Sequence, residues 1–154
     1  MMGDMRSTEL LSQQHIRLAT IFDELEFTQD AEERLRLAAH LAEQLKLHAA
    51  IEEDVFYPTL ERVGSDAAAI VTEALEAHHA VDALLDELLG SQLTPTTVSA
   101  LRALVSRHIE DEEARLFPLV ERLGEDAQSE LAQRVERYNR EEENAELGVE
   151  DAGP

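Results

Sequence analysis

Histidine and glutamate recur together at a helical spacing in this sequence. His48 and Glu52 are four residues apart, and His108 and Glu112 repeat the same pair later in the chain. Residues four apart lie about 40° around an α-helix and ~6 Å along it, so each pair presents an imidazole and a carboxylate on one face. Iron, manganese and zinc all accept these ligands. The spacing therefore indicates a metal site.

Both pairs lie within a longer stretch that occurs twice. HAAIEEDVFYPTLERVG begins at His48 and HIEDEEARLFPLVERLG begins at His108, and the two share the histidine, the glutamate pair, the proline, the Glu-Arg and the glycine in register. The residues before them are also similar, so the chain divides into two halves of similar pattern, 7–64 and 65–124. Two helical hairpins related by an approximate twofold would bring their repeated residues together across one core.

Each His–Glu pair interrupts an apolar stripe that should face this core, because the stripe repeats every three or four residues. The two stripes consist of Leu41, Leu45, His48, Glu52 and Val55, and of Leu101, Leu104, Val105, His108 and Glu112. An ionised carboxylate is costly to bury alone, so these glutamates must be paired or bound to a cation. Two buried His–Glu ion pairs would satisfy them, but a bound metal explains the repeated set better.

Further histidines extend the set. His15 precedes Leu18 by three residues and therefore shares its buried face. The second half offers His78 and His79 side by side. His78 is in register with the apolar residues that follow it, whereas His79 is in register with Asp82. We expect His78 to face the core and His79 to face solvent or a helix boundary, with His79 as the alternative ligand.

The predicted metal ligands are His15, His48, Glu52, His78, His108 and Glu112. Six protein ligands exceed the four of a structural zinc site, and they suit two metal ions with open positions and bridging carboxylates. His40 has no counterpart in the second half and is expected at the surface. Glu53 and Glu113 are rotated about 100° from the ligands. They either accept hydrogen bonds from ligand imidazoles or lie on a solvated face, and we favour the second.

The elements that must position these residues are helices. Their expected bounds are Ser7 to Glu26, Asp30 to Val63, Ser65 to Leu89, Thr94 to the residue before Gly124, and a shorter fifth helix from Asp126 to Arg140. Ser7, Asp30, Ser65, Thr94 and Asp126 are the expected N-caps. Pro58 and Pro118 should kink or break the second and fourth segments. Short connections between long amphipathic helices predict an all-α fold, an up-down-up-down four-helix bundle made of two similar hairpins.

Composition excludes several classes of function. A formal net charge of −21 at pH 7 argues against nucleic-acid and anionic-membrane partners. The sequence contains no Cys, which excludes disulfides, iron–sulfur clusters, thiolate zinc sites and thiol catalysis. We find neither a signal peptide nor an apolar run long enough to span a membrane, so we expect a soluble, cytoplasmic protein. Residues 1–140 should form the domain, and the acidic stretch 141–154 a disordered tail.

The order His…His-x-x-x-Glu…His…His-x-x-x-Glu, over roughly residues 7–124, resembles the hemerythrin-like HHE cation-binding domain family. The stretches EEDVFYP and EEARLFP, each with a glutamate pair, an aromatic residue and a proline, match that family as well. The resemblance implies two non-haem iron ions on the six predicted ligands. Glu52 and Glu112 would be the bridging carboxylates, with or without an additional oxo bridge.

The resemblance also implies a function: reversible binding of dioxygen, or sensing of oxygen, nitric oxide or redox state. The alternative is a di-iron enzyme that decomposes hydrogen peroxide or oxidises ferrous iron. A third hypothesis is a metal-free helical module whose acidic tail contacts a protein partner.

Two features leave this site open to interpretation. Hemerythrins proper take two histidines, one turn apart, from the third helix, but here the residue four after His78 is Asp82. Asp82 could serve as a carboxylate ligand or lie outside the site. Tyr57 could lie near the site, but its counterpart Phe117 lacks a hydroxyl, which argues against a required role. Nitrogen and oxygen ligands alone also leave manganese and zinc as alternatives to iron.

Overall fold

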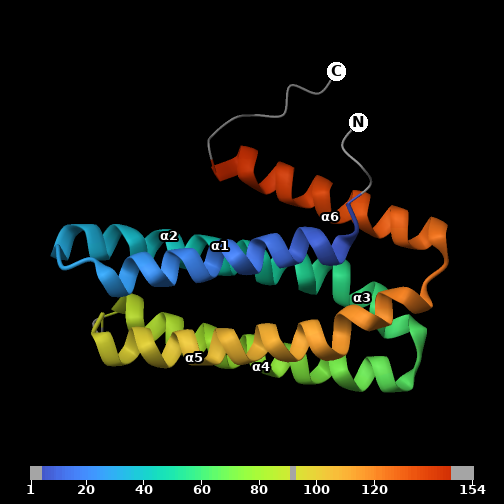
Figure 1. Ribbon diagram of the computed structural model, residues 1–154, viewed down its shortest axis with the longest axis horizontal. Coiled ribbons are helices and arrows are strands. Elements are labelled where there is room, and N and C mark those ends of the chain that lie inside the picture. The colour runs from blue at the N-terminus through green and yellow to red at the C-terminus, as the bar shows by residue number, and fades with distance from the viewer. Residues whose placement is uncertain (1–4, 91–92, 147–154) are drawn as a thin grey trace.

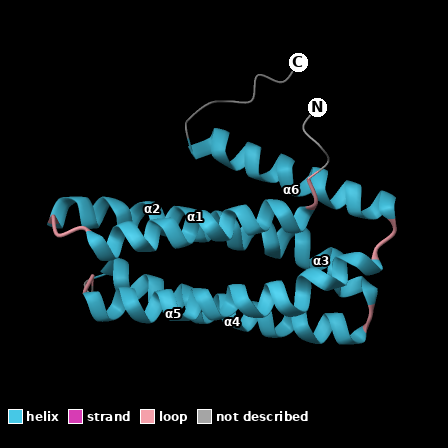
Figure 2. Cartoon of the chain, in the orientation of Figure 1, coloured by secondary structure: helices cyan, strands magenta, loops and turns pink. Residues whose placement is uncertain are grey.

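The computed structural model describes residues 5–90 and 93–146 of the chain. The bundle is formed by four helices, α1 (Ser7–Phe27), α2 (Ala31–Ile51), α4 (Ser65–Gly90) and α5 (Pro95–Asp111). They run up, down, up and down, with α1 beside α2 and α4 beside α5 (Figure 1). The described residues form only helices and the short loops between them, with no β-strand (Figure 2). The predicted all-α bundle is confirmed.

The two internal prolines do not break their helices. After α2 the chain continues through a π-helical turn, η1 (Glu52–Phe56), then α3 (Tyr57–Leu60) and the 3₁₀ turn η2 (Glu61–Val63). After α5 it continues through a second π-helical turn, η3 (Glu112–Leu116), and the 3₁₀ segment η4 (Phe117–Arg122).

A proline causes this change of helix type in each half. Pro58 has no N–H, and its ring would clash with the carbonyl four residues earlier in an α-helix. The wider π turn removes that conflict, and Tyr57 N–H donates to the Glu52 carbonyl five residues back. In the second half Phe117 N–H donates to the Glu112 carbonyl in the same way. Each π turn therefore begins at a glutamate of the predicted site.

Two of the predicted N-caps are confirmed. The Asp30 side chain accepts from Glu33 N–H at 3.1 Å, and Thr94 Oγ1 accepts from Thr97 N–H at 3.2 Å. The other three caps were predicted wrongly, because each helix begins before its expected first helical residue and a preceding carbonyl already accepts a helical bond. Those carbonyls belong to Arg6 before Ser7, Gly64 before Ser65, and Gly124 before Glu125 and Asp126.

The fifth helix is not short. α6 (Glu125–Glu146) has 22 residues, against 21 in α1. Residues 141–146, predicted as the start of the disordered tail, are therefore helical, since glutamate favours helix and Asn139 reaches Glu143 by a hydrogen bond. Residues 147–154 of the predicted tail lie outside the described residues. α6 packs on α1, α2 and η1, on the side of the bundle away from α4 and α5 (Figure 1).

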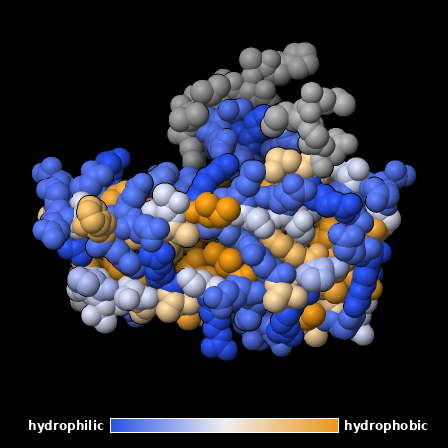
Figure 3. All heavy atoms as spheres, in the orientation of Figure 1, coloured by the Kyte–Doolittle hydropathy of each residue, from blue (hydrophilic) through white to orange (hydrophobic). Residues whose placement is uncertain are grey.

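The core consists of two apolar clusters with a polar layer between them. On α1, for example, Leu11 belongs to one cluster and Leu18 to the other, with buried His15 between them. Leu104, predicted in a buried stripe, is 37% exposed. The face in Figure 3 is mostly hydrophilic, and hydrophobic side chains show in the seam between the two helix pairs. Among the described helices we find none that is both long and apolar enough to cross a membrane.

Candidate metal centre

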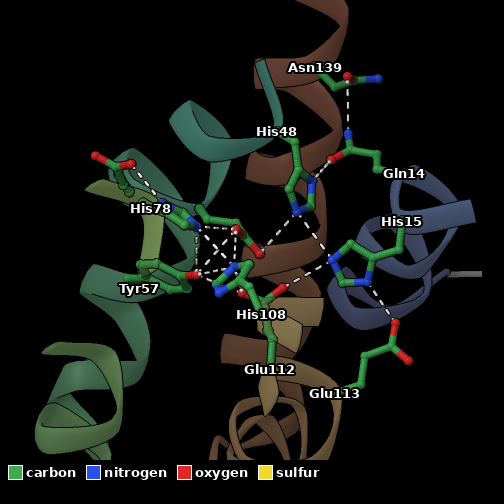
Figure 4. Close-up of polar contacts among 11 residues, drawn as sticks. Gln14, His15, His48, Tyr57, His78, His108, Glu112, Glu113 and Asn139 are labelled. Atoms are coloured by element: carbon green, nitrogen blue, oxygen red, sulfur yellow. Dashed lines mark hydrogen bonds and ion pairs between the residues drawn. The ribbon is translucent and has the colours of Figure 1, made fainter. Parts of the chain in front are cut away.

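The polar layer of the core contains all six predicted ligands. They lie on α1, α2, η1, α4, α5 and η3, and all are buried: His15, His48, Glu52, His78, His108 and Glu112. Figure 4 labels all of them except Glu52, and the labelled side chains point toward one another. His79 and His40 are exposed, as predicted. Asp82 is also exposed and is absent from both ligand groups described below. Of the two adjacent histidines, His78 is the one that joins the centre.

The histidines form two close pairs. His15 Nε2 lies 3.2 Å from His48 Nε2, and His78 Nε2 lies 3.0 Å from His108 Nε2. Nitrogen ligands lie about 2.1 Å from a metal, so two at right angles around one cation are about 3.0 Å apart. Each pair therefore has the spacing of two ligands of one cation.

Both carboxylates are shared between the histidine pairs. Glu112 Oε1 lies 3.1 Å from His15 Nε2, and its Oε2 lies 3.4 Å from His108 Nε2. Glu52 Oε1 lies 3.0 Å from His78 Nε2, and its Oε2 lies 3.3 Å from His48 Nε2. The two resulting groups that could hold a metal ion are His15, His48, Glu52 and Glu112, and Glu52, His78, His108 and Glu112.

Glu52 shows that protein groups alone do not satisfy this layer. Its side chain is fully buried, and no described residue gives its Oε2 a hydrogen bond of good geometry, although His48 Nε2 is 3.3 Å away. An incompletely bonded carboxylate oxygen is costly in a core. A cation between the imidazoles would satisfy it, and the buried nitrogen and oxygen donors fit such an ion.

Without a metal, the centre holds protons instead. Burial lowers the pKa of His108, but hydrogen bonds and the charges of Glu112 and Glu52 outweigh it and raise the pKa to about 10. Burial also lowers the pKa of His15 and of His78, but their contacts with glutamates outweigh it, so both pKa values are raised. Burial would raise the pKa of Glu52, but the charge of His48 and hydrogen bonds in the cluster lower it well below its ordinary value. A cation would replace these protons.

Two glutamates outside the ligand groups orient histidines across the bundle. His15 Nδ1 lies 2.6 Å from Glu113 Oε2, and His78 Nδ1 lies 2.8 Å from Glu53 Oε2. Each glutamate therefore supports a histidine from the other half of the chain. Our preference for a purely solvated role was wrong, although both side chains remain part-exposed. Such contacts fix the ring orientation and increase the basicity of a ligand nitrogen.

The hydrogen bond that supports His48 was not predicted. His48 Nδ1 lies 2.6 Å from Gln14 Oε1, and the Gln14 amide donates to Asn139 Oδ1 on α6 at 3.3 Å (Figure 4). Gln14 precedes His15 and lies off the apolar stripe, so its residue type and position carry no recognisable signal. Only the packing of α1 against α2 and α6 brings these groups together.

The hydroxyl of Tyr57 lies in the middle of the centre. It donates to Glu112 Oε2 at 2.6 Å and lies 3.2 Å from His78 Nε2. Burial and the charges of Glu52 and Glu112 raise the pKa of Tyr57, so in the metal-free centre it is a neutral phenol. Tyr57 therefore lies near the site, as the sequence allowed, and its counterpart Phe117 has no hydroxyl to place there. In an α-helix Tyr57 would lie about 140° around the axis from Glu52, but the π turn brings it over Glu52.

An apolar cavity adjoins the centre. It has a volume of about 30 Å³ and reaches His48, His78 and His108. Its other walls include Leu18, Leu45, Val81, Val105 and Ile109, with Asp82 also on the lining. One water molecule needs about 10–15 Å³ of cavity volume. The cavity is larger than this and therefore has room for a diatomic molecule beside the three imidazoles.

Comparisons with known proteins agree with the fold and the centre. The family model of the hemerythrin HHE cation binding domain matches residues 6–120. The chain is also similar to the crystal structure of a hemerythrin HHE cation binding domain-containing protein from Mycobacterium kansasii, with 24% identity, a TM-score of 0.72 and 88% of each chain covered. That likeness concerns the fold. No curated protein matches the chain. Four histidines and two glutamates of the chain converge in one buried layer, in two groups that could each hold a metal ion. Since the family model also spans most of the chain, the protein is metal-binding and belongs to the hemerythrin HHE cation-binding domain family.

Proposed function

We propose that this protein binds two non-haem iron ions in the buried centre and uses them to bind dioxygen, or to sense oxygen or nitric oxide. One observation carries the proposal: each of two buried carboxylates presents one oxygen to each of two histidine pairs. A mononuclear site does not need two carboxylates placed in this way.

The proposed ligands divide into two positions. His15 and His48 serve the first metal position, and His78 and His108 serve the second. Glu52 and Glu112 bridge them. Membership of a hemerythrin-type cation-binding family and the mixed nitrogen and oxygen donors support iron as the metal. A di-iron centre supplies electrons to a bound oxidant.

The apolar cavity supports a small, apolar ligand. Its walls of Leu18, Val81 and Val105 offer water no hydrogen bond on the side that faces three of the proposed histidine ligands. Dioxygen and nitric oxide need no hydrogen-bonding partner to enter such a space, whereas water loses its own on entry. Exclusion of water also protects a reduced centre from side reactions.

Tyr57 favours a second candidate function, the decomposition of hydrogen peroxide. Its hydroxyl holds a proton at Oη, 2.6 Å from Glu112 Oε2 and 3.2 Å from both His78 Nε2 and Glu52 Oε1. A peroxide needs protons delivered to its oxygen atoms before water can leave, and a phenol at this place can donate one. Dioxygen carriage needs no such donor.

Absorption spectroscopy on iron-loaded protein separates these functions. The protein is reduced without oxygen, exposed to dioxygen, returned to an oxygen-free atmosphere, and then given peroxide. A near-ultraviolet charge-transfer band that rises with oxygen and falls on its removal supports binding. Sustained loss of peroxide over many turnovers supports the enzyme instead. A spectrum that responds to neither oxidant contradicts both.

A further inference from the structure

The four histidines of the centre are not supported equally. Three of them have a hydrogen-bond partner at Nδ1: His15 has Glu113, His78 has Glu53 and His48 has Gln14. His108 Nδ1 has no such partner among the residues that the structure describes, and Figure 4 draws no contact to it.

The residue that precedes the first histidine of each half explains why His48 has a partner at Nδ1 and His108 does not. Gln14 precedes His15 in the first half, and Ala77 precedes His78 in the second half. Gln14 reaches His48 on the neighbouring helix, but the methyl group of Ala77 is too short to reach His108. The approximate twofold of the bundle is therefore broken beside one histidine of each pair.

The missing side chain leaves a cavity. It has a volume of about 40 Å³, extends from Ala77 and His108 to Glu112, and is also lined by Glu73, Asp111 and Arg115. Arg115 Nη1 binds Glu73 Oε2 at 2.6 Å, and both of these side chains are about half exposed. The cavity thus connects a bridging glutamate and an imidazole with charged residues at the surface of α4, α5 and η3. Its volume is sufficient for one or more water molecules.

At the other metal position the equivalent space is filled. Gln14 occupies the space beside His48, and its amide is in turn held by Asn139 of α6. α6 packs over α1, α2 and η1, so a further helix covers that half of the centre. The two similar hairpins therefore differ at one place: the space beside His48 is filled by Gln14 under α6, and the equivalent space beside His108 is a cavity.

We propose that the cavity beneath Ala77 is the port through which the metal ion on His78 and His108 exchanges with solvent, so that this ion is labile and the ion on His15 and His48 is retained. The inference rests on the proposed dinuclear centre. Water in the cavity would have access to His108 Nδ1. The exposed carboxylates of Glu73 and Asp111 also line the cavity and would offer oxygen ligands between the site and solvent.

The test measures release of ferrous ions from fully loaded, oxygen-free protein after addition of an excess of a chromogenic ferrous chelator. The unmodified protein should release one ion in a fast phase and one in a slow phase. Hydrogen-bond partners of ligand histidines typically change metal affinity by about 10–100-fold. We therefore expect the rates of the fast and the slow release phase to differ by about tenfold or more.

Two reciprocal variants locate the port. Ala77→Gln supplies His108 with the partner that Gln14 gives His48 and fills the cavity, so the fast phase should slow by about tenfold. Gln14→Ala opens the equivalent space beside His48, so the slow phase should accelerate toward the fast one. Ala80→Gln, on the exposed face of the same helix, is the matched control and should release metal as the unmodified protein does.

The outcomes separate the two proposals. Loading below two ions per chain overturns the dinuclear function, and this inference with it. Two bound ions that leave the unmodified protein at one common rate overturn this inference alone. An unchanged fast phase in Ala77→Gln would also overturn this inference alone, provided that the variant keeps its helical circular dichroism and binds two ions.

Discussion

The Tyr57 hydroxyl lies 2.6 Å from Glu112 Oε2, across the boundary between the two halves of the chain. The residues belong to different hairpins, and each is positioned by a π-helical turn that precedes an internal proline. π turns of this kind are frequent at functional sites. The repeated proline therefore serves the centre, because it sets the local geometry that aims Tyr57 and both glutamates, Glu52 and Glu112, inward.

Tyr57→Phe should destabilise the metal-free protein by about 1–3 kcal/mol, because it leaves the buried Glu112 oxygen without its closest donor. Urea denaturation followed by circular dichroism measures the change. Tyr138→Phe is the control, since Tyr138 donates to Asp54 at the surface and its loss should cost less. Equal destabilisation by the two variants would contradict the structural role of the Tyr57 hydrogen bond.

Glu113→Ala should weaken metal binding by about 10–100-fold, because His15 then loses the carboxylate that fixes its ring. Competition with a chelator of known affinity gives the constant. Glu110→Ala removes an exposed glutamate from the same stretch of helix and should leave the affinity unchanged. If both variants bind metal equally well, the Glu113 contact does not support the site.

His78→Ala should lose most of its bound metal, and His79→Ala should retain it, because only His78 points into the centre. Metal analysis after gel filtration makes the comparison. An emptied site in His79→Ala together with a full one in His78→Ala would reverse the assignment on α4.

The metal-free protein should lose stability as the pH rises from about 6.5 to about 10. Folding raises the pKa of His108 from 6.5 to about 10, so its contribution is complete below 6.5 and disappears as the pH passes the folded value. Glu52 acts in the opposite sense, but its pKa is lowered, so its contribution is lost only in acid. Urea midpoints across this range test the sign, and a constant midpoint would contradict a protonated centre.

The helices and four histidines of the centre could be predicted because they follow α-helical periodicity. His15, His48, His78 and His108 each fall on an apolar stripe, and the structure buries all of them. Periodicity left the place of Tyr57 open, because a π turn inserts one residue and rotates the following side chains by about 100° relative to an α-helix. Composition misled the prediction of the fifth helix, because an acidic stretch was taken for disorder although glutamate favours helix.

The contacts that support the ligands could not be predicted from periodicity alone. Gln14 and Asn139 act through a chain of hydrogen bonds that links three helices, and neither lies on an apolar stripe. Glu53 and Glu113 were considered, but choosing between solvent and an imidazole required the distance across the bundle. Such contacts depend on how helices pack, which a single sequence specifies only indirectly.

The number of metal ions bound per folded chain decides whether the two histidine pairs act as one dinuclear centre. Protein is reconstituted with excess ferrous iron under anaerobic conditions, freed of unbound metal, and analysed for iron against protein concentration. We predict two iron ions per chain. A value of one, or none, in protein that is folded and fully reconstituted would contradict a centre bridged by Glu52 and Glu112.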